Sequence, residues 1–360
     1  MRVAILGAGA IAYGGAAFLC REGHDPILWS PSGKRTAGLA GGSDLKATGA
    51  IEGRFRPRVA ATCEDAIRNA DVVMIALPAN GHRVVFDAAA PHLADGQVVL
   101  ISSHCSFGAL YLSKLLAARR VHVPIVAWST TVTTGRQRSG TEVHVGNVRK
   151  KVDMSVLPVS AMAKGFETCR ALFGDRFNER PDILAISLSN LNPQNHMGIA
   201  LCNLTRMELG ESWSQSGNTT DAVGRLLEAL DAERLNVAQA FGHTVRTIKD
   251  HFVLSFNTTP APVGEMARQM VARGDGTSGP TTLDTRYVTE DVPFGLLPTV
   301  LLGQLVGKPA TLHDAGVKIF SALYGRDFTA ENDLLPELNL ETVKVEMLKE
   351  LCRTGWPTSG

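Results

Sequence analysis

The chain begins Met1-Arg2-Val3-Ala4-Ile5-Leu6-Gly7-Ala8-Gly9-Ala10-Ile11-Ala12, a short apolar run that leads directly into Gly-x-Gly-x-x-Ala. A strand, a glycine turn and a helix in this order are typical of the first βαβ unit of a dinucleotide-binding domain. We expect Gly7 to make the tight turn and Gly9 to let a pyrophosphate approach the backbone. The helix that would bind the phosphates through its free N–H groups opens with Ala10, Ile11 and Ala12. A glycine-rich turn in another kind of α/β protein is the alternative, which the strand before and the helix after disfavour.

The segment after the second expected strand, Pro26–Ser30, indicates which dinucleotide binds. NAD-preferring sites usually carry Asp or Glu at this point to hold the ribose hydroxyls. Here hydroxyls and cations take their place, namely Ser30, Ser32, Lys34 and Arg35. Hydroxyls and cations bind a 2′-phosphate well, so we expect NADP(H) to be preferred, with NAD(H) possible. The alternative is that the two cations belong to an ordinary solvated loop.

Length and composition narrow the class of protein. The chain has 360 residues, enough for two domains, and 44% of them are hydrophobic and 20% charged, as in globular proteins. A net charge of +1 gives no reason to expect nucleic acid or membrane partners, and no apolar run is long enough to span a bilayer. We expect no signal peptide and a cytoplasmic location. The six cysteines are scattered without a C-x-x-C pair, which predicts buried, reduced thiols and no disulfide or metal site.

The first half of the chain alternates apolar runs with helical stretches. Near-continuous apolar runs at Asp71–Pro78, Gln97–Ser102 and Pro124–Trp128 predict buried parallel strands. Ligands of such sheets bind at the carboxyl ends of the strands. We therefore expect the loops there to contribute Leu77, Pro78 and Ser102 to the cofactor site and Thr130 to the substrate site. Two further stretches are expected to add antiparallel edge strands, Val143–Gly146 and Met154–Leu157.

From about Ile186 onward the apolar period becomes helical. We expect helices over Thr220–Gly242, Leu296–Val306, Thr311–Tyr324 and Glu341–Leu351, with Asp221 as the N-cap of the first. The predicted fold class is α/β. A doubly wound Rossmann-type parallel sheet in residues 1–186 would be followed by an all-helical substrate and dimerisation domain in residues 187–360.

His196 is the histidine whose position best suits proton transfer. A nicotinamide enzyme needs a general acid or base for the proton on the substrate oxygen or nitrogen. His196 follows Asn192-Pro193, an expected N-cap and first helical position, and so falls in the first turn of a helix. The alternative is a histidine bonded to backbone at a domain junction.

Asp291 is the candidate partner of His196. It precedes Val292-Pro293 and an apolar run, so its position alone favours a helix N-cap, and Glu290 is the rival acid. Arginine is the usual ligand of a substrate carboxylate. Arg206, expected on the same helix as His196, and Arg286 are the candidates, although either could be a surface cation or a structural ion pair.

Three segments of the helical half resemble the opine dehydrogenase family. They are Asn192-Pro193-Gln194-Asn195-His196 continuing to Glu208, Gly279-Pro280-Thr281-Thr282-Leu283-Asp284-Thr285-Arg286-Tyr287 continuing to Val292, and Asp231-Ala232-Glu233-Arg234 ahead of Phe241. The resemblance spans essentially the whole chain and is to the octopine/nopaline dehydrogenases. It is closest to the bacterial N-(1-D-carboxyethyl)-L-norvaline dehydrogenase type.

The resemblance implies an NAD(P)-dependent dehydrogenase acting on CH–NH donors. A 2-oxo acid and an amino acid or amine would form an imine, which NAD(P)H reduces to a secondary amine. By the match, His196 takes the place of the catalytic histidine and Asp291 that of its paired acid, so Asp291 is assigned to the histidine and not only to a cap. The resemblance also implies a homodimer. Two departures are Ser30, where that bacterial relative carries Asp, and Met197, where it carries proline.

A ketopantoate reductase or 3-hydroxyacid dehydrogenase, acting on a C=O/CH–OH substrate, is the alternative function. Proteins of those families resemble this architecture but use a lysine early in the helical domain. The present chain has no lysine between Lys164 and Lys249, which argues against them.

Overall fold

In the computed structural model, which describes residues 1–358, the contacts divide the chain into two units. One comprises Met1–Ser187 with the chain from Glu346 onward, and the other is Leu188–Val345. We expected all of 187–360 to form the second domain. Instead, the last helix, α17 (Val345–Thr354), carries the chain back to the first unit, where the backbone N–H of Trp356 donates to Ser113 Oγ at 2.8 Å. Helix α17 has an apolar face that must be covered, and its residues Leu348, Leu351 and Cys352 are buried.

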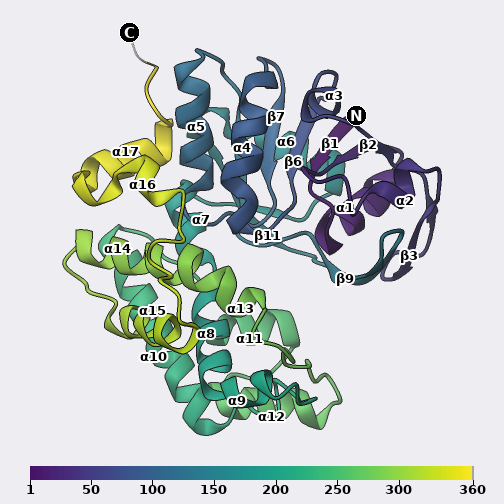
Figure 1. The fold of residues 1–360 in the computed structure, drawn as a ribbon. Helices are drawn as coiled ribbons and strands as arrows, with labels where there is room; N and C mark the ends of the chain where they lie inside the picture. The colour runs from purple at the N-terminus through teal and green to yellow at the C-terminus, as the bar shows by residue number, and fades with distance from the viewer. Residues whose placement is uncertain (359–360) are drawn as a thin grey trace. The chain divides into compact units, whose positions relative to one another are not determined.

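The first unit is built on an eight-stranded sheet ordered β12-β11-β8-β7-β6-β1-β2-β5 (Figure 1). The strands are β1 (Arg2–Leu6), β2 (Asp25–Trp29), β5 (Arg58–Val59), β6 (Val72–Ile75), β7 (Val98–Ile101), β8 (Ile125–Trp128), β11 (Val152–Leu157) and β12 (Phe177–Glu179). All neighbours pair in parallel except β8 and β11. The expected doubly wound parallel sheet is confirmed. The Met154–Leu157 segment is antiparallel as expected, but it is not an edge strand, because β12 pairs outside it.

A second sheet of four strands, ordered β4-β3-β10-β9, lies against α1 (Ala10–Arg21) in the first unit. Its strands are β3 (Leu45–Gly49), β4 (Gly53–Phe55), β9 (Thr133–Ser139) and β10 (Glu142–Val148). The expected strand at Val143–Gly146 therefore belongs to a separate sheet. Because α1 lies between the two sheets, it needs small residues on both sides. A Cβ at Gly14 would lie 3.0 Å from Thr133 Oγ1, and one at Gly15 would lie 3.6 Å from the Met74 methyl.

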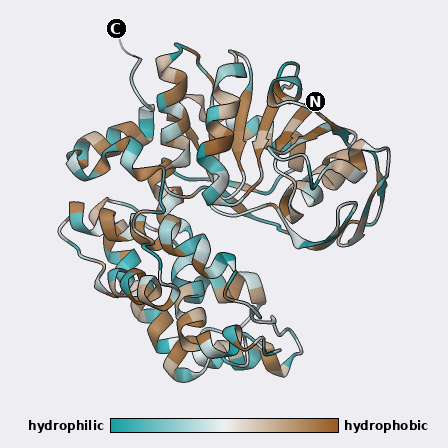
Figure 2. Ribbon diagram, viewed as in Figure 1, coloured by the Kyte–Doolittle hydropathy of each residue, from teal (hydrophilic) through white to brown (hydrophobic). Residues whose placement is uncertain are grey.

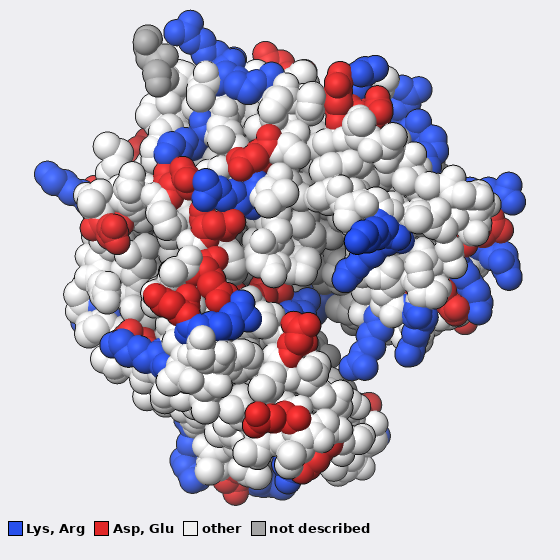
Figure 3. Space-filling model, in the orientation of Figure 1, with Lys and Arg blue, Asp and Glu red and all other residues white. Residues whose placement is uncertain are grey.

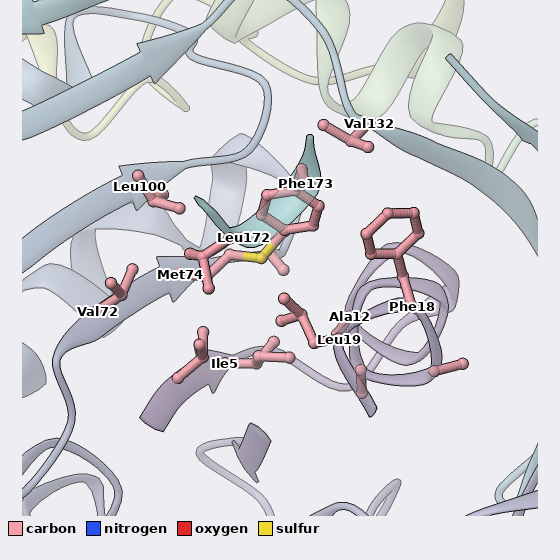
Figure 4. Packing of buried hydrophobic residues seen from close by; sticks show 14 of the residues in the cluster. Ile5, Ala12, Phe18, Leu19, Val72, Met74, Leu100, Val132, Leu172 and Phe173 are labelled. Atoms are coloured by element: carbon pink, nitrogen blue, oxygen red, sulfur yellow. The ribbon is translucent and has the colours of Figure 1, made fainter. Parts of the chain in front are cut away.

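The core of the first unit joins the main sheet to the helices that cover it. Figure 4 shows strand residues Ile5, Val72, Met74 and Leu100 packed with residues of α1 and α6, namely Ala12, Phe18, Leu19, Leu172 and Phe173. The remaining helices of this unit are α2 (Ala37–Ala40), α3 (Cys63–Ile67), α4 (His82–Ala89), α5 (Gly108–Ala118), α6 (Met162–Phe173) and α7 (Ile183–Ser189), whose last residues enter the second unit. Their hydropathy alternates by face, whereas the central strands are apolar throughout (Figure 2).

The second unit is helical. Its elements are α8 (Asn192–Cys202), α9 (Leu204–Glu208), α10 (Asp221–Ala240), α11 (Ile248–Phe256), α12 (Val263–Ala272), α13 (Arg286–Thr289), a π-helical turn (Val292–Leu296), α14 (Leu297–Leu305), α15 (Thr311–Tyr324) and α16 (Leu335–Leu338). Two expected caps are wrong. Thr220, not Asp221, caps α10 by accepting from the Val223 N–H, and Asn192 is the first residue of α8 and not its N-cap.

Within residues 1–358, no helix combines the length and apolarity that crossing a membrane requires. The six cysteines are free, as expected. Cys202 is exposed and Cys20 half-buried, so the expectation that all six are buried is wrong for these two. The reason is that Cys202 ends α8, where the helix surface faces solvent.

Candidate active site

The turn after β1 requires glycine at position 7. Gly7 has φ +142°, and a Cβ there would lie 2.2 Å from the carbonyl oxygen of Ala76. Its N–H donates to the carbonyl of Trp29 at 2.8 Å. The turn is therefore packed between the ends of β2 and β6, and no side chain fits it.

The N-terminus of α1 is open in a way that suits a phosphate. Its N-cap is Gly9, in an extended conformation with no side-chain cap, and a Cβ at Gly9 would meet nothing within 4 Å. Ala10 and Ile11 are half-buried and Ala12 is buried beside Gly7. The first N–H groups of this twelve-residue helix thus lack a side-chain acceptor from the cap, which is the arrangement that binds a dinucleotide pyrophosphate.

The other expected cofactor residues follow parallel strands and share this edge of the sheet. Leu77 and Pro78 follow β6, Ser102 follows β7, and Thr130 follows β8. Within residues 1–358, the buried hydroxyls of Ser30 and Ser102 have no protein hydrogen-bond partner. Two buried hydroxyls at the carboxyl ends of β2 and β7 fit a bound dinucleotide, because each needs a partner that a ligand can supply.

Two buried histidines hold the loops at this edge. Nε2 of His82 donates to the Leu77 carbonyl at 3.2 Å, and Nε2 of His104 accepts from the Ala109 N–H at 3.2 Å. Burial lowers the pKa of His82 to about 4 and that of His104 to about 3, so both are neutral at pH 7. Neither histidine was among the site residues expected from the sequence.

The loop that carries Ser30, Ser32, Lys34 and Arg35 is fixed by Tyr13 of α1. The Tyr13 hydroxyl lies 2.6 Å from the carbonyl oxygen of Arg35 and 2.9 Å from that of Gly140, in the β9–β10 turn. The side chains of Lys34 and Arg35 are exposed. Figure 3 shows basic side chains gathered over the part of this unit that carries α2, β3 and β9, with a few acidic ones among them.

In the second unit, the Nδ1 atom of His196 lies 2.6 Å from Oδ2 of Asp291. His196 lies on α8, and Asp291 precedes the π-helical turn; both are buried. The Asp291 side chain makes no cap hydrogen bond, so the helix-cap interpretation of this carboxylate is wrong. Since Nδ1–H donates to the carboxylate, the lone pair of neutral His196 is on Nε2. The pair has the form of a general base with an orienting acid.

A tyrosine that the sequence analysis did not assign completes this cluster. The rings of Tyr287 and His196 are stacked, with centroids 3.6 Å apart and an angle of 10° between their planes. The Tyr287 hydroxyl donates to Gln215 Oε1 at 2.7 Å. The spacing held a signal, because Tyr287 and Asp291 are four positions apart and face the same side of a helical turn.

The two arginines expected to bind substrate lie in different places. Arg206 is on α9 and not on the helix of His196, because α8 ends before Asn203. The Arg206 side chain is exposed, and its Nη1 lies 3.3 Å from Oε2 of Glu211. Arg286 opens α13 and lies 3.6 Å from Glu290. Glu290 therefore pairs with Arg286, and Asp291 is the acid that contacts His196.

The Asp231–Arg234 segment has a structural role. Arg234 is 2% exposed and its guanidinium binds Asp231 on the same helix. Glu233 accepts from Nδ1 of His313 and from the Leu312 N–H, each at 2.8 Å, and so caps α15 from α10. This carboxylate stands in for a local N-cap.

Two family models match different parts of the chain. Residues 179–324 match the family model "NAD/NADP octopine/nopaline dehydrogenase, alpha-helical domain", and residues 3–156 match that of ketopantoate reductase PanE/ApbA. An opine dehydrogenase of Arthrobacter sp. (strain 1C) is 29% identical over 341 residues, covering 94% of each chain.

Solved structures share the fold. An octopine dehydrogenase with NADH and L-arginine superposes with a TM-score of 0.79 at 18% identity, covering 98% of each chain. A yersinopine dehydrogenase with NADP⁺ superposes with a TM-score of 0.68 at 15% identity, over 94% of this chain and 98% of the other.

Proposed function

We propose that the chain is an NAD(P)-dependent oxidoreductase acting on CH–NH donors, because its helical half matches the octopine/nopaline dehydrogenase model and 94% of the chain is similar to an opine dehydrogenase. Its reaction is the reduction of the imine formed from a 2-oxo acid and an amino acid or amine. The observation that carries this proposal is the buried His196–Asp291 hydrogen bond of 2.6 Å. A proton-transfer pair of this kind is what imine reduction requires of the protein beyond binding.

The residues have distinct roles in the proposal. His196 exchanges a proton through Nε2 with the carbinolamine oxygen or the substrate nitrogen. Asp291 fixes the tautomer and the orientation of the imidazole through the hydrogen bond at Nδ1. When bound, NAD(P)H would supply a hydride to the imine carbon. A proton added to the nitrogen completes the change from C=N to CH–NH. Arg286, Arg206 and Thr130 are the candidates for the substrate carboxylates, with Arg286 the nearest of them in sequence to Asp291.

The cofactor site of the proposal is the edge of the sheet around Gly7 and Gly9. The cradle at the α1 N-terminus fits the pyrophosphate of either dinucleotide. NADP(H) is preferred over NAD(H) in this proposal, because Ser30, Ser32, Lys34 and Arg35 offer hydroxyls and cations where an acid would repel a 2′-phosphate. We further propose that the protein is cytoplasmic and forms a homodimer. Sedimentation of the purified protein tests the homodimer.

A screen of NADPH oxidation tests the reaction. Pyruvate, glyoxylate and 2-oxoglutarate are each paired with a panel of amino acids and amines. Turnover that needs both partners supports the proposal. Turnover with the oxo acid alone contradicts it and favours the hydroxyacid or ketopantoate type, against which the absence of lysine between Lys164 and Lys249 argues.

Two histidine variants test the mechanism. His196→Ala is expected to abolish turnover and leave NADPH binding, measured by fluorescence titration, nearly unchanged. The control is His92→Ala, a half-buried histidine of the first unit, which should retain activity. Full activity of His196→Ala would overturn the proposed mechanism.

A further inference from the structure

The imidazole of His196 is held at two places by different kinds of contact. Its Nδ1 edge is bound to Asp291, and one of its faces is covered by the ring of Tyr287. A centroid distance of 3.6 Å and an angle of 10° mean that the two rings lie almost flat on each other. These contacts restrict different motions of the same ring.

A hydrogen bond at one ring atom does not fix the plane of the ring. The bond to Asp291 limits rotation about Cβ–Cγ, but its angular dependence is broad, so the ring can still tilt about the Nδ1···Oδ2 line. A flat aromatic surface against one face blocks tilting to that side. The lone pair of Nε2 lies in the plane of the ring, so a tilt of the ring changes the direction in which this lone pair points.

Tyr287 is itself tied at its far end. Its hydroxyl donates to Gln215 Oε1 at 2.7 Å. The backbone N–H of Gln215 donates to the Thr277 carbonyl at 2.7 Å, and the adjacent Ser214 forms a β-bridge with Ser278. Gln215 thus belongs to a segment that is paired with a second loop and offers a firm anchor.

We propose that Tyr287 is a positioning residue for His196, and that its bond to Gln215 sets the plane of the imidazole so that Nε2 points in one direction. The inference rests on the proposed function insofar as His196 transfers the proton. Tyr287 acts through the imidazole ring that it covers.

Three single variants and one double variant test the proposal by steady-state kinetics. Tyr287→Phe and Gln215→Leu each remove the tether and keep the covering ring, so we expect each to lower kcat about 2- to 10-fold, the worth of one hydrogen bond. The double variant should fall no further than either single one, because both remove the same bond. Tyr287→Leu removes the covering ring and should lower kcat about 10- to 100-fold with KM for NADPH unchanged.

The matched control is Tyr324→Phe. Tyr324 donates to the carbonyl of Leu283, in the loop that leads to Tyr287, but it makes no stack with His196. If Tyr287 only stabilised this part of the fold, Tyr324→Phe and Tyr287→Phe would lower the melting temperature by similar amounts, and both variants would have the same kcat. Additive loss in the double variant, or an unchanged kcat in Tyr287→Leu, would overturn the proposal.

A second readout does not depend on activity. The Tyr287 ring should shift the imidazole proton resonances of His196 upfield, and His196→Ala identifies those resonances among the histidine signals. Tyr287→Leu should move them downfield, while Tyr324→Phe leaves them in place. Resonances that do not move in Tyr287→Leu would overturn the inference about Tyr287. The proposed function is refuted by a different result, namely a wild-type protein that turns over no pair of oxo acid and amine.

Discussion

Asp291 Oδ2 and His196 Nδ1 lie 2.6 Å apart although the two residues are 95 positions apart in the chain. Helix α8 supplies the imidazole from its fifth residue, and the junction between α13 and the π-helical turn supplies the carboxylate. π-Helical turns recur at functional sites, because the extra residue turns side chains away from the ordinary helical direction. Here the Asp291 carboxylate meets a histidine and does not cap the helix.

Asp291→Asn should lower kcat by about 10²-fold or more, because an amide carries no charge and can select the wrong imidazole tautomer. NADPH binding and the melting temperature should change little. Steady-state kinetics and fluorescence titration measure these effects. Asp314→Asn, an exposed acid of α15 that pairs with Lys318, is the control and should behave as wild type. Equal kcat values for the two variants would contradict the role of Asp291.

Cofactor preference should depend on the loop after β2. Replacing Lys34 and Arg35 together by alanine should weaken NADPH binding about 10- to 100-fold, the worth of a charged hydrogen bond, with little effect on NADH. Ser30→Asp should shift the preference toward NADH, since a carboxylate binds ribose hydroxyls and repels a 2′-phosphate. Ratios of kcat/KM for the two cofactors measure both effects. Arg56→Ala serves as the control, because Arg56 pairs with Asp44; a loss of NADPH preference in this variant would contradict the assignment.

Alanine substitutions at the two glycines of the first turn should affect different properties, namely stability at Gly7 and NADPH binding at Gly9. Gly7→Ala places a Cβ against the Ala76 carbonyl at a positive φ, so it should lower the free energy of unfolding by about 3 kcal/mol or more. Gly9→Ala meets no protein atom within 4 Å, so the fold should be unaffected. Its methyl group would stand where the pyrophosphate approaches, and NADPH binding should weaken about 10-fold. Thermal melts and binding titrations separate the two results, and a Gly9→Ala protein that binds NADPH normally would contradict the cradle.

Glu233 should make the stability of the helical unit sensitive to acid. Burial by itself would raise the pKa of Glu233, but hydrogen bonds from His313, Leu312 and Thr311 lower it to about 2, from an ordinary value of 4.5. Because the folded pKa lies below the unfolded one, the stabilisation is complete above pH 4.5 and is lost as the pH falls toward 2. Glu233→Gln should lower the free energy of unfolding by about 2 kcal/mol at pH 7, and this difference from wild type should shrink toward pH 2.

Urea unfolding at several pH values measures this difference. Glu208→Gln, an exposed glutamate at the end of α9, is the control and should show no such pH dependence. A Glu233→Gln protein as stable as wild type at pH 7 would mean that the cap on α15 contributes nothing.

Much of the first unit could be predicted because its signals are local. A buried parallel strand is an apolar run, and the glycine turn, the three later strands and their loops follow from that pattern within one to three residues. The four-stranded sheet over α1 could not be predicted, because it pairs residues 45–55 with residues 133–148. The return of α17 to the first unit likewise depends on which surface its apolar face meets.

The candidate site divides in the same way. The sequence by itself determined that a dinucleotide-type turn opens the chain, and the resemblance at His196 and Asp291 indicated a pair whose contact the structure then showed. Only the tertiary structure decided that the Asp291 side chain makes no cap hydrogen bond, that Tyr287 covers the imidazole, and that Glu233 caps a distant helix. Sequence patterns report the backbone and the buried face of each element, whereas the partner of a polar side chain is fixed by packing between elements far apart in the chain.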